Sequence, residues 1–247
     1  MKIYVLNLIR VKRVIAMLLL IAFSVAVTAS LLFVFDTHVL ASAEPQVGNE
    51  IKTVILDPGH GGEDCGAIGV NGIYEKDLNL SISLAAKRLL EEKGYTVIMT
   101  RTEDKMLYSE EENVKGMRKL SDLKNRCKVA SRYPDAVLVS IHMNSFGAQE
   151  YYGLQVYYSG GSDSGRLLAE KIQQRVRSDV QPENTRSVKD AKNLYILENS
   201  PVTAVIVECG FLSNAAECEK LLEKEYQNEL SLAIVCGIID YIEANQQ

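Results

Sequence analysis

Short apolar runs alternate with longer amphipathic stretches from about residue 51 onward. The apolar runs predict strands at residues 53–57, 95–100, 136–141, 154–158, 193–197 and 202–207. Stretches with apolar residues on one helical face predict helices at about 75–93, 120–132, 167–176 and 230–242. Asn214 with Glu217 resembles a capping box that opens a further helix. This alternation predicts a single α/β domain with a mostly parallel, twisted sheet of about six strands, flanked by helices.

Residues 103–118 interrupt the alternation, because they are polar, rich in glutamate and without clear periodicity. We interpret them as an excursion near the edge of the sheet. Two readings stay open: a solvated surface loop, or a lid that faces a substrate.

The N-terminal segment follows a different pattern. Four basic residues, the last of them Arg13, precede a run from Val14 to Phe35 that carries no charge. A run of that length fits a membrane-spanning helix, whereas the small residues at 41–43 are typical of a cleavage site. We expect residues 1–43 to be a signal peptide or an N-terminal membrane anchor, and residues 44–51 to be a linker. Both interpretations place the rest of the chain outside the cytoplasm, as an exported protein.

Composition argues against several classes of protein. The chain has 247 residues, a net charge of −5 and no basic stripe, so we expect no binding to nucleic acid through phosphate contacts. A G-x-x-x-x-G-K-[ST] motif is absent, so the glycines near residue 60 do not indicate a nucleotide-binding loop. The five cysteines include no Cys-x-x-Cys pair, which argues against a cysteine-based zinc site. We expect most of them to be small buried residues.

Histidines and glutamates at strand ends are the strongest candidates for chemistry. His60 and His142 each follow an apolar strand, and Glu208 lies at the end of a third. Ligands of open α/β sheets bind beyond the carboxyl ends of strands, so these side chains can converge. Two histidines and one glutamate are a recurring ligand set for catalytic zinc, and a second carboxylate, Glu75 or Glu208, could act as general base. The residues alone leave open a purely structural role for the histidines, or a cysteine–histidine nucleophile pair.

Four segments also resemble, in order, the signatures of a known family. They are ILDPGHGGEDCGAIGVNGIYEKDLNL, TRTED, SIHMNS and VIVECGFLSN. Together they are similar to the zinc-dependent N-acetylmuramoyl-L-alanine amidases of the type-3 class, over about residues 52–244. The resemblance implies one Zn²⁺ ion held by His60, Glu75 and His142, with Glu208 as the catalytic base. It further implies substrate contacts at Arg101 and Asn144, and a catalytic domain that spans residues 52–247.

The resemblance implies an enzyme that cleaves the amide bond between the lactyl group of muramic acid and L-alanine in peptidoglycan. The small, membrane-targeted layout resembles the sporulation branch, which acts in spore cortex as a step toward muramic-δ-lactam and germination. The rivals are a vegetative autolysin or cell-separation amidase, a zinc peptidase that cuts elsewhere in the stem peptide, and a non-catalytic peptidoglycan-binding module. We see neither a wall-binding module nor an occluding helix, so we expect an accessory activator or localising protein. The sequence sets no oligomeric state.

Overall fold

The computed structural model describes residues 51–245, together with positions 17, 20, 21, 23 and 24. The chain divides into two units, Met1–Gly48 and Asn49–Gln247. Apart from those five positions and residue 51, the expected signal peptide or anchor and the expected linker lie outside the described residues. Among the helices described, none combines the length and the apolar character that crossing a membrane requires.

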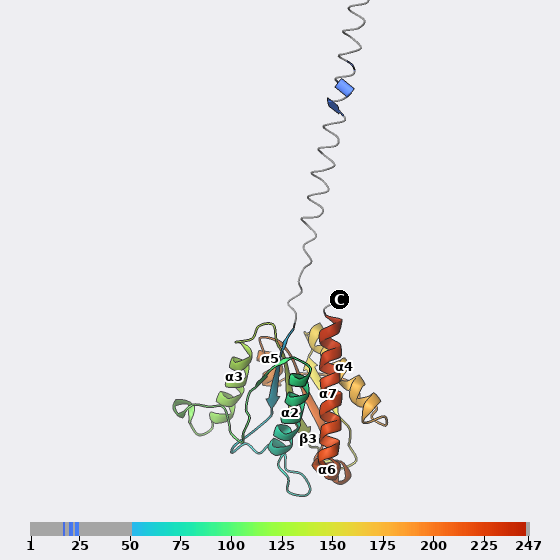
Figure 1. The fold of residues 1–247 in the computed structure, drawn as a ribbon. Helices are drawn as coiled ribbons and strands as arrows, with labels where there is room; N and C mark the ends of the chain where they lie inside the picture. Colours follow the sequence, from blue (N-terminus) through green and yellow to red (C-terminus); the bar gives the residue numbers. More distant parts are fainter. Residues whose placement is uncertain (1–16, 18–19, 22, 25–50, 246–247) are drawn as a thin grey trace, which may run out of the picture. The chain divides into compact units, whose positions relative to one another are not determined.

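A six-stranded sheet forms the centre of the larger unit (Figure 1), and its strands follow the order β2-β1-β3-β6-β4-β5. All neighbouring strands are parallel except β4 and β6, which run antiparallel. The strands are β1 (Thr53–Pro58), β2 (Thr96–Met99), β3 (Val137–Asn144), β4 (Gln155–Ser159), β5 (Lys189–Ala191) and β6 (Thr203–Phe211). The central position of β3 and β6 explains their nearly continuous apolar sequences, since both faces of a central parallel strand are covered.

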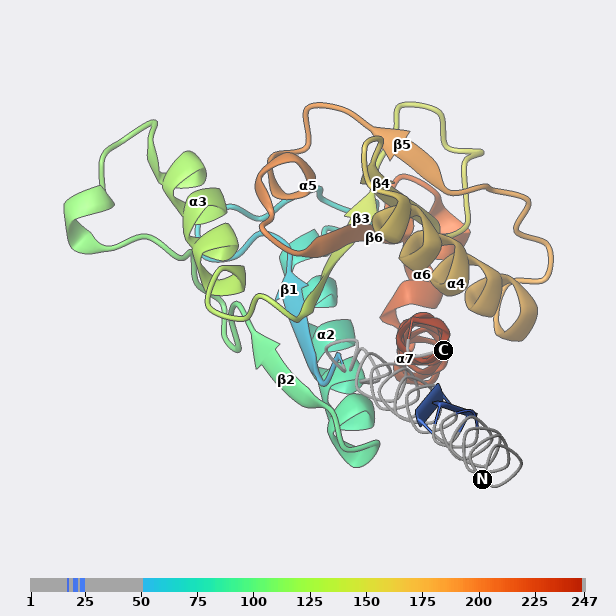
Figure 2. The same ribbon diagram turned by 90° about the horizontal axis from the view of Figure 1, so that it is seen from above.

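Helices cover both faces of this sheet, as Figure 2 shows. Helices α2, α4 and α7 pack on one face, whereas α3 and α5 lie on the other. The helices are α2 (Glu75–Glu92), α3 (Arg118–Ala130), α4 (Asp163–Asp179), α5 (Tyr195–Asn199), α6 (Ala215–Leu222) and α7 (Lys224–Ala244), with a 3₁₀ turn at Glu110–Glu112. The predicted α/β domain with a mostly parallel sheet of about six strands is confirmed.

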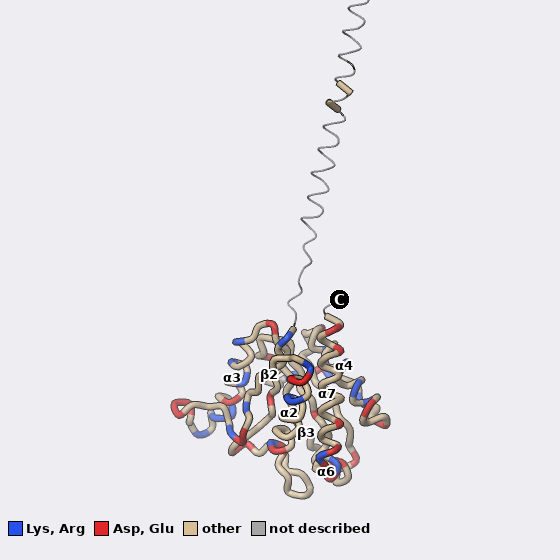
Figure 3. The backbone as a smooth tube through the Cα atoms, in the orientation of Figure 1, with Lys and Arg blue, Asp and Glu red and all other residues tan. Residues whose placement is uncertain are grey.

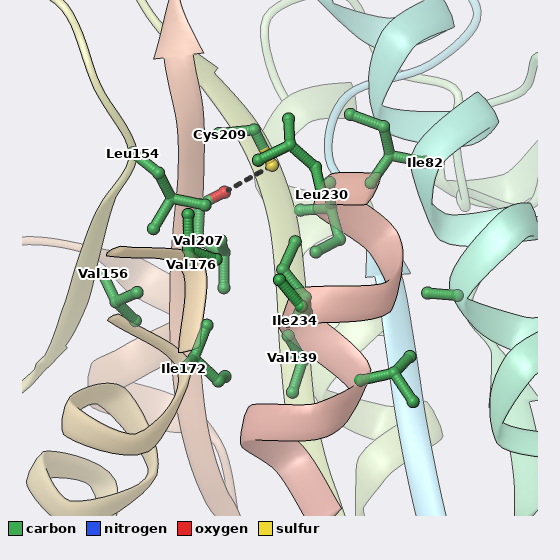
Figure 4. Packing of buried hydrophobic residues seen from close by; sticks show 14 of the residues in the cluster. Ile82, Val139, Leu154, Val156, Ile172, Val176, Val207, Cys209, Leu230 and Ile234 are labelled. Carbon is green, nitrogen blue, oxygen red and sulfur yellow. Dashed lines mark hydrogen bonds between the residues drawn. The ribbon is translucent and has the colours of Figure 1, made fainter. Parts of the chain in front are cut away.

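Two buried clusters follow from the alternation of side chains along the central strands. Val139 and Val207 point into the cluster under α2, α4 and α7, whereas Leu138 and Ile206 point into the cluster under α3 and α5. Figure 4 shows α7 presenting apolar side chains to the first cluster. Gly237 allows α7 to approach α4 closely, because a Cβ atom at this position would lie only 2.5 Å from a backbone atom of α4.

The strand predicted at residues 193–197 is wrong. Residues Tyr195–Asn199 form the short helix α5, and the sixth strand is instead the three-residue edge strand β5. Ile196 and Leu197 are consecutive and both buried in the same cluster, which a helical turn permits and a strand does not. The carboxylate of Glu198 accepts a hydrogen bond of 2.7 Å from the backbone of Asn193, which closes the turn.

The predicted capping box at the start of α6 is formed only in part. The side chain of Asn214 accepts a hydrogen bond from the backbone of Glu217, as expected. The carboxylate of Glu217 instead accepts from the backbone N–H groups of Phe211 and Gly153, at 2.7 and 2.8 Å. It therefore joins the end of β6 to the segment that leads into β4.

The excursion at residues 103–118 lies beside α3 and is hydrogen-bonded to it (Figure 1). Asp122 accepts from the backbone of Leu107 at 2.6 Å, and Asn125 donates to Glu112 at 2.7 Å. Charges of both signs mix along this segment and α3 (Figure 3). The structure therefore attaches the excursion to α3, and a lid function stays a prediction.

Candidate functional site

The histidines and glutamates singled out from the sequence meet at the carboxyl edge of the sheet. Strand β3 lies between β1 and β6, and His142 of β3 is paired with Glu208 of β6 in the strand register. His60 follows the end of β1, and Glu75 is the first residue of α2. Three neighbouring strands and one helix N-terminus thus place four chemically capable side chains at one point.

His60, Glu75 and His142 form a compact set of donors. The Nε2 atom of His60 lies 3.2 Å from Oε2 of Glu75, and Nδ1 of His142 lies 2.9 Å from its Oε1. The two imidazole rings stand edge to face, with centroids 4.9 Å apart. Their ligand atoms all lie within 4.8 Å of one another, and within the described residues this is the one such group that could hold a metal ion. Two imidazole nitrogens and a carboxylate are a donor set that suits zinc.

Asp64 fixes the orientation of the first histidine. Its Oδ2 atom lies 2.9 Å from Nδ1 of His60, which leaves Nε2 directed at Glu75. Burial lowers the pKa of His60, but the hydrogen bonds to Asp64 and Glu75 outweigh it and raise the pKa to about 9. The metal-free centre therefore carries a proton where a cation would otherwise lie, and metal binding must displace it.

Glu75 is held in place as a carboxylate. Burial favours a higher pKa for Glu75, but hydrogen bonds and charge from His142 and His60 hold that pKa far below its usual range. Backbone N–H groups of Ala67 and Met143 donate to its two oxygens at 2.8 and 3.0 Å. The side chain is thus an anion at any physiological pH.

Two glycines make room for this cluster. A Cβ atom on Gly59 would lie 2.2 Å from the ring of His142. A Cβ atom on Gly66, whose φ is +68°, would lie 2.5 Å from Oε2 of Glu75. The glycine-rich loop is therefore required by the close approach of its backbone to the three donors.

Glu208 differs from Glu75 in having no partner for one of its oxygens. The Oε2 atom is shut off from solvent and has no hydrogen-bond partner among the described residues. Burial raises the pKa of Glu208 to about 7. A carboxyl group with such a pKa can both accept and return a proton near neutrality, which suits a general acid–base.

Arg101 and Asn144, the two residues expected to contact substrate, lie in different surroundings. Asn144 is half-buried at the end of β3, two positions after His142. Arg101 is only 2% exposed, and its Nε and Nη2 donate to the carbonyl oxygens of Pro58 and Gly59, each at 2.9 Å. This geometry favours a role for Arg101 in positioning the loop that carries His60.

Arg126 is a residue of this site that the sequence analysis missed. It is 1% exposed and pairs with Asp57 at 2.6 Å, while its Nη2 donates to the carbonyl oxygen of His60 at 2.7 Å. The spacing of Asp122 and Arg126 on a predicted helix signals an ion pair, but not that it is buried. The buried pair connects α3 to the loop after β1.

Comparison with known proteins agrees with this geometry. Residues 54–240 match the family model Amidase_3, described as N-acetylmuramoyl-L-alanine amidase. The chain belongs to this amidase family. The germination-specific N-acetylmuramoyl-L-alanine amidase of Bacillus subtilis (strain 168) is 34% identical over 190 residues, which cover 77% of this chain and 79% of that protein. The probable cell wall amidase LytH of Staphylococcus aureus is 32% identical over 78% of this chain and 59% of its own length.

A solved structure shows the same fold in an amidase of this family. The CwlD amidase from Clostridioides difficile, determined in complex with the GerS lipoprotein, superposes with a TM-score of 0.75 at 39% identity. The match covers 78% of this chain and 99% of that one. The family resemblance stated from the sequence is therefore confirmed, as is the fold.

Proposed function

We propose that this chain is a zinc-dependent amidase that hydrolyses the bond between the lactyl group of muramic acid and L-alanine in peptidoglycan. The observation that carries the proposal is the convergence of His60, Glu75 and His142 beside the unpartnered carboxylate oxygen of Glu208. Membership of the amidase family supports the reaction, and the donor set supports the metal.

The three donors fit zinc by their chemistry and by their convergence. Two nitrogens and one anionic oxygen face a common point, and the fixed orientation of His60 is typical of a histidine that binds a metal. When bound, zinc supplies a Lewis acid that polarises a carbonyl group and acidifies water. A protein with three ligand residues leaves room for exchangeable groups at a catalytic zinc.

The other residues of the site have separate roles in the reaction. Glu208 accepts the proton of the water that attacks the amide carbon, and then returns this proton to the departing amine of L-alanine. Asn144 lies on the same strand as His142, where its amide group can hydrogen-bond the substrate. Arg101 and Arg126 donate hydrogen bonds to the backbone carbonyl oxygens of residues 58–60, which keeps His60 in position.

Glu208→Gln and His142→Ala test the proposal together. The purified wild-type protein should contain about one zinc per chain and release stem peptides that begin with free L-alanine, identified by mass spectrometry. We expect Glu208→Gln to keep its zinc and lose hydrolysis by about 10²–10⁴-fold, and His142→Ala to lose both zinc and hydrolysis. Release of peptides cut elsewhere would indicate a peptidase, and zinc-loaded protein that binds but cuts nothing would indicate a binding module.

We further propose that the substrate lies in spore cortex, outside the cytoplasm. The similarity to a germination-specific amidase supports this, whereas the similarity to LytH keeps a vegetative wall amidase as the rival. In a sporulating host, deletion of the gene should remove muramic-δ-lactam from cortex muropeptides and leave the vegetative wall unchanged. An altered vegetative wall with normal cortex would favour the rival.

An extracytoplasmic partner is also part of the proposal. The related CwlD amidase of Clostridioides difficile was solved with the GerS lipoprotein, which shows that a relative with this fold assembles with another protein. We expect this chain to gain zinc occupancy or activity from a comparable lipoprotein. Full zinc content and full hydrolysis by the isolated protein would contradict a required activator.

A further inference from the structure

Strands β4 and β5 form a surface next to Glu208. They lie on the side of β6 that faces away from the proposed metal ligands. Gln155 of β4 is paired with Glu208 across the antiparallel ladder, and their side chains share one face of the sheet, with Cβ atoms about 4.5–5.5 Å apart in such pairs. Tyr157 follows on the same face. Both side chains are half-buried, whereas Ile206 farther along β6 is 6% exposed under α3 and α5. Tyr157 packs against the edge of that cluster, and Gln155 lies two residues nearer the carboxyl edge of the sheet, next to Glu208.

Arg186, from the segment between α4 and β5, lies over this surface. Its guanidinium group stands 4.4 Å from the ring centroid of Phe211 and 5.7 Å from that of Tyr151. Its Nη1 donates to Oε1 of Gln155 at 3.1 Å, and its Nε donates to the carbonyl oxygen of Tyr152 at 2.7 Å. Stacking and two hydrogen bonds fix the plane of the guanidinium beside the residue that pairs with Glu208.

The hydrogen-bond and stacking partners of Arg186 are all neutral, although burial raises the pKa of Glu217 and the charge of Arg186 opposes that rise. Arg126 is paired with Asp57 and Asp122, whereas Arg186 makes no ion pair with any carboxylate among the described residues. Its Nη2 also has no hydrogen-bond partner in the part of the chain described. A half-buried, fixed guanidinium that makes no direct ion pair is suited to accept an anion, which it can bind through two parallel N–H donors.

Two cations, Arg186 and Lys189, lie near Tyr157 on this surface. Burial raises the pKa of Tyr157, the charge of Glu208 raises it further, and the charge of Arg186 opposes the rise. The phenol therefore lies within electrostatic reach of both charges. Lys189 adds a second cation, with its Nζ 5.7 Å from the ring centroid of Tyr157. Two cations thus lie on the side of Glu208 that faces away from the proposed metal ligands.

We propose that Arg186 forms a carboxylate-binding subsite for the peptide part of the substrate, which reads the free carboxylate of the residue that follows L-alanine. This inference rests on the proposed function, because Glu208 marks where the amide bond is cut. The second residue of the stem peptide bears the carboxylate nearest to that bond, and the guanidinium lies one strand away from Glu208. The subsite would orient the peptide and discriminate between acidic and amidated stem peptides.

The test is a matched pair of muropeptides that differ only in whether the second residue carries a free carboxylate or a carboxamide. Wild-type protein should cleave the carboxylate form with a kcat/KM at least tenfold higher. Arg186→Gln should lower kcat/KM for this form about tenfold to a hundredfold and change the carboxamide form by less than about twofold. Arg186→Lys, which keeps the charge but loses the planar fork, should recover part of the loss.

Arg166→Gln is the matched control, because Arg166 is exposed on α4 and should leave both substrates unaffected. If Arg186 only held the two neighbouring segments together, Arg186→Gln would impair both substrates equally, and this outcome would overturn the subsite. Equal cleavage of both substrates by wild-type protein would also overturn it while leaving the amidase function standing. Cleavage of neither would contradict the amidase function itself, and the subsite with it.

A binding measurement separates recognition from turnover. In the Glu208→Gln protein, which we expect to bind substrate without cutting it, calorimetric titration should give at least tenfold tighter binding of the carboxylate muropeptide. Adding Arg186→Gln should abolish this preference. A preference that survives the second substitution would show that another group reads the carboxylate, against the proposal.

Discussion

Arg126 donates a hydrogen bond of 2.7 Å to the carbonyl oxygen of His60, a residue 66 positions earlier in the chain. His60 has a φ of +60°, a left-handed backbone conformation that costs a residue other than glycine of the order of 1–3 kcal/mol. The same guanidinium pairs with Asp57 at the end of β1. The backbone of the first proposed metal ligand is therefore held by a buried cation on α3.

Replacement of Arg126 by methionine should destabilise the protein by about 3–5 kcal/mol, because it leaves the fully buried carboxylate of Asp57 without its counter-ion. Urea denaturation measures this change. Arg132→Met, at an exposed position near the end of the same helix, should change the free energy of unfolding by less than about 0.5 kcal/mol. Equal effects of the two substitutions would show that the buried pair contributes no more to the free energy of unfolding than an exposed arginine does.

Gly66→Ala should lower metal content strongly, since its Cβ atom would lie 2.5 Å from Oε2 of Glu75 and 2.7 Å from the ring of His60. Gly72→Ala is a matched control, because Gly72 also has a positive φ, of +78°, but no neighbouring atom within 4 Å. Both variants therefore carry backbone strain, and only the first displaces a donor. Metal analysis after dialysis against a weak chelator should separate them, whereas equal metal loss would place the cause in the backbone alone.

Asp64→Ala should weaken metal binding about 10–100-fold, because the imidazole of His60 loses the carboxylate that fixes its orientation. Competition with a coloured chelator gives the affinity. Glu63→Ala removes the neighbouring carboxylate, which is exposed and pairs with Arg118 at 2.6 Å, and should leave the affinity within about twofold. A similar loss in both variants would point to the general charge of the loop.

The metal-free protein should lose stability as the pH rises, through Glu208. Burial raises the pKa of its carboxyl group from 4.5 to about 7, so the folded state disfavours the charged form. The linked stability is fully present below about pH 4.5 and is lost as the pH rises through 7, by roughly 3 kcal/mol. Denaturation of chelator-treated wild-type and Glu208→Gln proteins at pH 5 and pH 8 should show a larger loss of stability in the wild type, because His60, whose pKa is raised to about 9, contributes a loss in both proteins. The same pH dependence in both would remove Glu208 as its cause.

Local patterns in the sequence were sufficient for most of the fold. Apolar runs such as that at residues 202–207 predicted the central strands, because strands covered on both faces must be apolar throughout. The pattern failed at residues 193–197, where two consecutive apolar residues occupy one helical turn. It could not show that β4 runs antiparallel to β6, because strand direction depends on pairing between segments distant in sequence.

The candidate site was also predicted only in part. Strand ends and the family signatures placed His60, His142 and Glu208 at one edge, and the structure brings them together with Glu75. Arg126 escaped notice because a charged residue on an amphipathic helix is normally exposed. Arg126 is buried because it pairs with Asp57 and donates to the carbonyl oxygen of His60. Both partners are distant in sequence, so no local pattern reveals them.

The order in which the strands are synthesised sets the order in which the site can form. Its ligands come from β3, from the loop after β1 and from the start of α2, and β6 with Glu208 is the last strand to be synthesised. Strand β3 pairs with β1 but lacks its second neighbour, β6, until residues 203–211 have emerged. A chain that ends before β6 would therefore carry the three proposed metal ligands without Glu208, the proposed general base. Hydrolysis by the proposed mechanism would thus begin only once β6 has joined the sheet.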